Sequence, residues 1–180
     1  MATDEKLVGP FPAGIPPAEY DRLRRRVLWA MPSGLYVLGS RAGSRRNLMT
    51  LNWASQVASD PKLLAVSIET VAVTHALVRE GRVFSLNLID RNDRALVRKF
   101  VKPLDDHGDP SELAGFPVRS YVTGAPILEL AAAWIECEVR QEVPCGSHTL
   151  FLGEVVGCGT RAGDGFEVLR MEDTRMNYGG

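Results

Sequence analysis

The chain has 180 residues, of which 45% are hydrophobic, and its formal net charge is −1 at pH 7. This length and apolar content predict one domain with a buried core. Acidic and basic residues are interspersed, which argues against nucleic acid as an obligate partner, because neutralising phosphates needs a clustered basic surface. No apolar run approaches the ~18 residues that cross a bilayer, and no signal-like segment opens the chain, so we expect a cytoplasmic protein without a membrane partner.

The predicted elements are mainly strands. Residues 1–17 are rich in proline and glycine and are expected to form an N-terminal arm. We expect one domain over 18–172 and a loose C-terminal tail over 173–180. The expected strands, in chain order, span 34–40, 47–57, 63–69, 82–89, 134–143, 149–156 and 166–171. The expected helices span 18–31, 74–80 and 92–101.

Local signals refine this pattern. In the short middle helix, Thr74 is expected to be the N-cap and Gly81 to stop the helix. Residues 102–124 form a long polar excursion, and Pro144 to Ser147 make a tight connection between two long strands. Many short strands with turn signals and few helices predict a closed or partly closed antiparallel barrel.

Two motifs suggest a dinucleotide-binding loop and a metal site, but each is better explained as an ordinary turn or loop. Gly157, Gly159 and Gly163 have the spacing GxGxxxG and lead into another strand, so we expect a hairpin turn and not a dinucleotide-binding loop. A loop holds four residues with metal-binding side chains, which are Asp105, Asp106, His107 and Asp109. Because no second cluster completes a coordination shell, we expect a solvated loop and no metal site.

The three cysteines are Cys137, Cys145 and Cys158. Their number is odd and they lack CxxC spacing. These features are typical of reduced thiols in a cytoplasmic protein and not of a disulfide framework or a zinc site.

The segment Asn47–Pro61, NLMTLNWASQVASDP, carries the strongest functional signal. It places amides, hydroxyls and a glutamine among apolar residues. A strand that only fills a core does not need so many donors and acceptors. A strand that lies along a flat ring with a polar edge needs many hydrogen-bond donors and acceptors. The isoalloxazine of a flavin is such a ring.

This segment resembles the flavin-contacting segment of the flavin reductase family, the FMN-binding split barrels. Four further segments match the family in the same order, and they are MPSGLYVLGSRAG, VTHALVREGRVFSLNLI, DRALVRKF and APILELAAAWIECEVRQEVPCGSHTLFLGEVV. The resemblance covers most of the chain. It implies a mainly β, antiparallel, Greek-key split barrel with a few flanking helices. It also implies a homodimer with FMN near the subunit interface.

The resemblance also implies site residues. The expected cofactor-binding residues are Asn47, Met49, Thr50, Leu51, Asn52, Trp53, Ala54, Ser55, Gln56, Val57, Ala58, Ser59, Asp60, Pro61, Thr74, His75 and Asn87. Thr74 is expected at the phosphate end, where a helix N-terminus suits a dianion. His148 resembles a histidine beside the open face of the flavin and is expected to be catalytic through contact with the nicotinamide. From the residues alone, His148 is equally explained as a strand cap.

The chain departs from the family at three places. Val71, Ala72 and Val73 stand where family members often have a serine and a base before the Thr-His pair, so the phosphate-binding base has to come from elsewhere. The candidates are Arg45, Arg46 and Arg79. Ser147 replaces the aspartate of a Gly-Asp-His motif, and the C-terminal segment with Tyr178 does not match closely.

These observations predict an FMN-dependent NAD(P)H:flavin oxidoreductase that transfers hydride to flavin N5. A reductase component of a two-component monooxygenase is one such role. The cofactor carries this chemistry, so the protein needs orienting groups more than a strong acid or nucleophile. Two alternatives stay open, namely an FMN-binding electron carrier that does not use NAD(P)H, and a split barrel that binds another planar ligand.

Overall fold

The structure is a computed structural model, and it describes residues 7–104, 106, 108–163, 165–174 and 176. Two compact units can be distinguished. One contains the described residues up to Pro32, and the other spans Ser33–Thr174. Within the described residues, no helix is long and apolar enough to cross a membrane.

The first unit is helix α1 (Pro17–Trp29) with the N-terminal arm folded back on it. The Arg24 guanidinium donates to the carbonyl of Val8 over 2.6 Å, and it stacks on the rings of Phe11 and Tyr20 at 5.9 and 5.7 Å. One arginine therefore fastens the arm to the helix through both a hydrogen bond and cation–π contacts.

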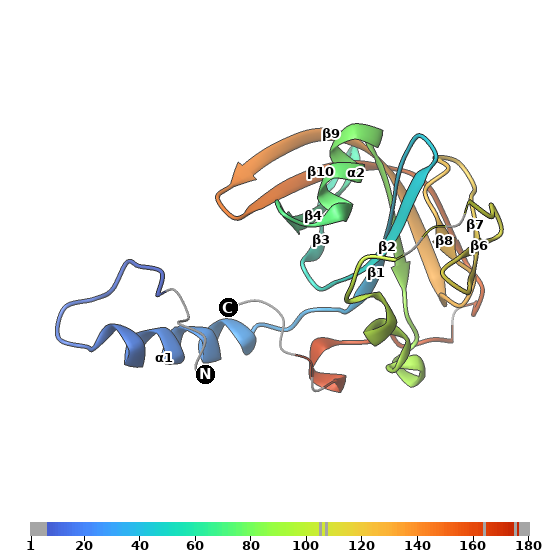
Figure 1. The fold of residues 1–180 in the computed structure, drawn as a ribbon. Coiled ribbons are helices and arrows are strands. Elements are labelled where there is room, and N and C mark those ends of the chain that lie inside the picture. The colour runs from blue at the N-terminus through green and yellow to red at the C-terminus, as the bar shows by residue number, and fades with distance from the viewer. Residues whose placement is uncertain (1–6, 105, 107, 164, 175, 177–180) are drawn as a thin grey trace. The chain divides into compact units, whose positions relative to one another are not determined.

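The second unit is built on a seven-stranded antiparallel sheet in the order β2-β1-β5-β9-β10-β4-β3 (Figure 1). Its strands are β1 (Tyr36–Ala42), β2 (Arg45–Leu51), β3 (Ala54–Ser59), β4 (Lys62–Glu69), β5 (Val83–Leu88), β9 (Ala133–Cys145) and β10 (His148–Thr160). A small sheet contains β6 (Glu112–Leu113), β7 (Phe116–Arg119) and β8 (Ile127–Leu128). The helical segments are α2 (Val73–Gly81), η1 (Arg91–Asp93), η2 (Leu96–Phe100) and η3 (Met171–Asp173).

The sheet curls because its two outermost strands are neighbours in sequence. β2 and β3 lie at opposite ends of the strand order, yet only Asn52 and Trp53 separate them. The two edges must therefore meet at this dipeptide, which we call the seam. The predicted mainly β, antiparallel split barrel is confirmed.

The core fills the inside of this curled sheet. Its buried side chains come from β1, β2, β4, α2, β5, β9 and β10, and they are Leu38, Leu51, Leu64, Val66, Ile68, Val78, Phe84, Leu86, Cys137, Val139 and Phe151. In β4, β5 and β9 the core members are two residues apart, as expected for side chains on one face of a strand.

Three predicted elements are wrong in detail. The expected strand 47–57 breaks at the seam into β2 and β3. The expected helix 92–101 is two short 3₁₀ segments, whose three residues per turn place the buried Val97 and Phe100 on one side. The expected strand 166–171 makes only single bridges, Val168 to Asp90 and Arg170 to Gly34.

The predicted limits of α2 also need correction. The N-cap is Ala72, without a side-chain hydrogen bond, and not Thr74. Gly81 lies inside the helix, and Arg82 takes the left-handed cap with φ 57°. Gly81 is needed for close packing, because a Cβ there would lie 1.7 Å from the carbonyl oxygen of Arg41 in β1.

The glycine-rich motif lies differently from expectation. Gly157 and Gly159 are inside strand β10 and do not form a hairpin turn. Gly159 pairs with Trp134 of β9, and a Cβ on it would lie 2.2 Å from the indole. Only Gly163, with φ 64°, lies in the turn that follows.

Candidate functional site

The residues expected to face a flavin form two groups, one exposed and one buried. The exposed group follows the seam along β3. Trp53 is 42% exposed and Val57 is 53% exposed, and Ser55, Gln56 and Ser59 to Pro61 are also exposed. The half-buried members of the same stretch are Ala54 and Ala58, and Met49 is half-buried in β2.

β3 is an edge strand that carries exposed polar groups. It pairs with β4 on one side only, and no described strand covers its other side. The Gln56 amide donates only to the nearby carbonyl of Ala58, over 3.1 Å, and the Ser55 hydroxyl to the carbonyl of Gln56, over 3.2 Å. These side chains are not tied into the core, so this edge offers donors and acceptors to a ligand.

The buried group holds strands and loops together. The Asn47 Nδ2 donates to Thr74 Oγ1 over 2.8 Å, and the backbone N–H of Leu104 donates to Asn47 Oδ1 over 3.1 Å. The Thr50 hydroxyl donates to the carbonyl of Val97. Thr74 is fully buried, and Leu51 and Asn52 are also buried.

Asn87 on β5 is fully buried, and both its amide nitrogen and its amide oxygen have hydrogen-bond partners within the protein. Its Nδ2 donates to the carbonyl of Val37 over 2.9 Å and to the hydroxyl of Ser85 over 3.1 Å, and its Oδ1 accepts the N–H of Leu128 over 2.8 Å. In this structure the amide therefore supports the barrel and links it to β8.

His75 faces the inside of the structure. Its Nε2 lies 2.8 Å from the hydroxyl of Thr149 on β10, and its ring packs against Phe151. Burial lowers the pKa of His75, and the positive charge of Arg79 lowers it further. The ring is thus a neutral group that links α2 to β10.

His148 lies at the seam. It is the first residue of β10, after the two-residue connection Gly146-Ser147, and it pairs with Glu69 of β4. Its ring centroid is 4.9 Å from that of Trp53, and its Nδ1 is 2.9 Å from the Ser147 hydroxyl. The structure therefore brings together the predicted catalytic histidine and one predicted flavin-contacting residue.

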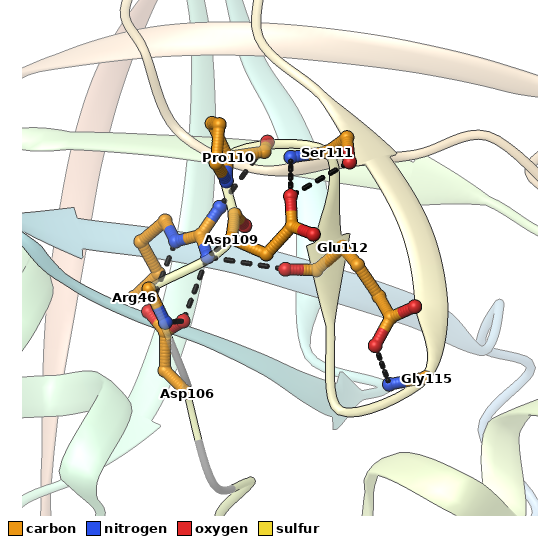
Figure 2. A network of polar contacts seen from close by, with 8 residues as sticks. Arg46, Asp106, Asp109, Pro110, Ser111, Glu112 and Gly115 are labelled. Atoms are coloured by element: carbon orange, nitrogen blue, oxygen red, sulfur yellow. Dashed lines mark hydrogen bonds and ion pairs between the residues drawn. The ribbon is translucent and has the colours of Figure 1, made fainter.

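Arg46 is committed to a loop and is not available for a phosphate. Its guanidinium binds both carboxylate oxygens of Asp106, at 2.9 and 2.7 Å, and the carbonyls of Asp109 and Glu112 at 2.7 and 3.1 Å (Figure 2). Figure 2 also shows Ser111 donating to Asp109, which holds the pKa of that carboxyl below its usual value.

Of the other two arginine candidates, Arg79 is the less engaged. Arg45 forms an ion pair with Glu80. Arg79 is 65% exposed, and its Nε is 3.6 Å from Glu142. Where a base was expected, the chain presents Val71 in the loop before α2 and Val73 at the first position of α2, which are 83% and 48% exposed.

The predictions about the acidic loop and the C-terminus are tested only in part. Asp105, His107 and Tyr178 lie outside the described residues. Asp106 serves Arg46 as described above, and the described residues contain no group of three or more His, Cys, Asp or Glu that could hold a metal. All three cysteines are free thiols, and burial raises the pKa of Cys137 to about 12.

Sequence reasoning missed Thr70. Its backbone N–H and its hydroxyl both donate to the carbonyl of Ser147, over 2.9 and 3.2 Å, and this fixes the connection that leads into His148. The two residues are 77 positions apart. Only the pairing of β4 with β10 brings them together, so no local signal could have found the contact.

Comparison with known proteins identifies the family of this chain. The model of the flavin reductase like domain matches residues 28–180. The chain belongs to this family. An NADH-dependent FAD reductase of Streptomyces globisporus is 31% identical over 150 residues, which are 78% of this chain and 80% of that protein.

Solved structures of family members have the same fold. The NADH:FAD oxidoreductase SgcE6 of S. globisporus, in complex with NAD and FAD fragments, superposes with a TM-score of 0.68 at 26% identity, over 81% of this chain and 85% of that one. The styrene monooxygenase flavin reductase of Pseudomonas putida S12 superposes with a TM-score of 0.63 at 29% identity, over 76% and 87%.

Other relatives are much longer. A diflavin flavoprotein of Synechocystis is 27% identical over 72% of this chain but only 22% of its own length. The chain thus spans about a quarter or less of the diflavin flavoproteins it matches.

Proposed function

We propose that this protein is an NAD(P)H-dependent flavin reductase that uses FMN. The observation that supports this most is the seam. There, Trp53 packs against His148 and leads directly into the exposed polar residues of β3, in a chain that belongs to the flavin reductase-like family. The NADH-dependent relatives and the SgcE6 structure with NAD and FAD fragments support the same activity.

The residues present fit a planar ring with a polar edge. The uncovered side of β3 carries backbone N–H and C=O groups together with Ser55 and Gln56. We propose that these groups meet the pyrimidine edge and the ribityl chain. The buried Asn47, Thr50 and Asn87 fix the positions of the strands that present them.

The phosphate end is proposed to face the start of α2. No side chain caps this helix, and since the N–H of His75 donates to the carbonyl of Ala72, the amides of Val73 and Thr74 are the ones proposed to meet an anion. Thr74 Oγ1 already accepts a hydrogen bond from Asn47, which leaves its own proton for a phosphate oxygen or a backbone carbonyl. Arg79, on the same helix, is the most exposed of the three candidate bases.

Bound flavin would supply the hydride acceptor, its N5 atom. The protein's part is to stack the nicotinamide against that ring in a reactive orientation, which is mainly a proximity effect. We propose that His148 contacts the nicotinamide, because it is half-buried at the seam with an aromatic neighbour and a hydroxyl partner.

We further propose a homodimer in the cytoplasm. Trp53, Val57, Val71 and Val73 expose apolar surface around the seam and the loop before α2, and a second copy would cover it. Static light scattering of the flavin-loaded protein at micromolar concentration tests this proposal, and a monomer mass contradicts it.

The likeness to the styrene monooxygenase reductase supports a monooxygenase as the acceptor of the reduced flavin.

The test of the activity is an anaerobic titration. Purified protein is mixed with FMN or FAD, and then NADH or NADPH is added while the visible absorption band of the flavin is followed. Rapid bleaching with either nicotinamide supports the reductase. Flavin binding without bleaching contradicts it and favours the electron carrier. Absence of binding to both flavins favours a different planar ligand.

A further inference from the structure

We infer that Trp53 and Ser147 are positioning residues for His148, which they hold so that Nε2 is the ring nitrogen presented to the dinucleotide. This inference rests on the proposed reductase function. It assigns the aromatic side chain of Trp53 a role that differs from flavin contact.

The backbone of Trp53 is fixed on both sides. The seam allows only Asn52 and Trp53 between β2 and β3, and the N–H of Ser67 in β4 donates to the carbonyl of Trp53 over 3.0 Å. β4 also pairs with β10 at Glu69 and His148. Trp53 and His148 are therefore attached to the same strand, and their separation is set by the sheet.

The Trp53 indole packs against the His148 ring at a tilt. The centroids are 4.9 Å apart and the planes are tilted by 55°. An aromatic pair at this distance favours a defined mutual orientation. Because Trp53 is 42% exposed, filling the core does not explain where its side chain lies.

Ser147 engages Nδ1 of the His148 ring. Its hydroxyl is 2.9 Å from His148 Nδ1, while its carbonyl accepts two hydrogen bonds from Thr70. The backbone of Ser147 is therefore held to Thr70, the residue that follows β4. With Nδ1 engaged by the Ser147 hydroxyl and the indole packed against the ring, Nε2 is the nitrogen that remains for a ligand.

The two ring nitrogens of a histidine are distinct, and the hydrogen bond at one sets what the other can do. A nicotinamide carboxamide has both a donor and an acceptor, so it can bind Nε2 in either tautomer of the ring. A fixed Nε2 orients the carboxamide, and through it the ring that transfers hydride. Loss of this orientation should raise the KM for NADH more than it changes the Kd for flavin.

The first test compares three variants of the full chain by steady-state kinetics and flavin titration. We expect Trp53→Leu to raise the KM for NADH about three- to tenfold, the range for one lost hydrogen bond, with the flavin Kd changed by no more than about twofold. Trp53→Phe keeps an aromatic ring and should recover most of the loss. The matched control is Trp29→Leu on α1, because Trp29 is also an exposed tryptophan, at 47%, and belongs to the other compact unit.

The second test reads the imidazole directly. The ¹⁵N resonances of His148 are assigned with the variant His148→Gln. In the FMN-loaded protein, added NAD⁺ should shift Nε2 more than Nδ1, and Ser147→Ala without nicotinamide should shift Nδ1. A larger NAD⁺ shift at Nδ1, or a Trp53→Leu enzyme that behaves like Trp29→Leu, would overturn the inference.

The two proposals fail in distinguishable ways. If the reductase function is wrong, NADH does not bleach flavin bound to the wild-type protein. If only the positioning is wrong, the wild-type protein is reduced normally. In that case Ser147→Ala leaves the Nδ1 resonance unchanged.

Discussion

Asn47 and Thr74 form a buried hydrogen bond of 2.8 Å that joins β2 to the start of α2, across 27 positions of sequence. The same Asn47 side chain accepts the N–H of Leu104. One amide thus connects a strand at the seam, a helix and the loop that follows η2.

Thr74→Val should lower the free energy of unfolding by about 1–3 kcal/mol, because it leaves the buried Asn47 Nδ2 without its acceptor. Thr74→Ser keeps the hydroxyl and is the control, with a smaller loss expected. Urea unfolding followed by circular dichroism measures both. Equal losses for the two variants would show that the hydroxyl contributes nothing.

Arg46→Lys should destabilise the protein by about 1–3 kcal/mol, because an ammonium keeps the charge but cannot replace a guanidinium that binds both oxygens of a largely buried Asp106. Limited proteolysis should cut the loop at 106–115 faster in this variant. The matched control is Arg45→Lys, whose ion pair with Glu80 is exposed and should be worth about 0–1 kcal/mol. Similar proteolysis rates for both variants would contradict the role of Arg46.

Stability should fall as the pH drops below about 6.5, the usual pKa of histidine, in a way that depends on His75. Burial and then Arg79 lower the pKa of this ring in the folded state. The unfolded chain therefore binds a proton that the folded chain does not. The contribution is fully present above the unfolded pKa and is lost as the pH falls through the folded one.

His75→Gln removes this titration while its amide can still reach Thr149. Melting midpoints measured from pH 8 to pH 5, a range of about three units around the usual histidine pKa, should fall less steeply for the variant than for the wild type. Parallel curves for the two proteins would mean that His75 does not couple stability to pH.

Gly81→Ala should lower the free energy of unfolding by about 1–3 kcal/mol or more, because the new methyl group would overlap the carbonyl of Arg41 and push α2 away from β1. Gly165→Ala is the control, since a Cβ there meets nothing within 4 Å. Thermal melts of both variants decide the point. A Gly81→Ala protein as stable as Gly165→Ala would show that helix and strand can separate at no cost.

The sequence by itself determined the class of fold and the approximate positions of most strands along the chain. A buried apolar run indicated β4, alternating apolar residues indicated β5, and the tight connection from Pro144 to Ser147 indicated the hairpin of β9 and β10, because these signals are local to each segment. The polar residues of the segment Asn47–Pro61 indicated a strand that contacts a ligand, but not the break of that strand at the seam.

Only the tertiary structure decided which of those polar residues are exposed. Asn47, Thr50 and Asn87 carry the same side-chain chemistry as Ser55 and Gln56. The first three, however, form hydrogen bonds with residues far away in sequence. Likewise, nothing local distinguishes Arg46, which clamps a loop 60 positions away, from Arg79. Contacts between residues that are distant in sequence depend on how the strands pair, and one sequence read locally does not contain that pairing. The curling of the sheet until β2 and β3 meet is therefore what places Trp53 against His148.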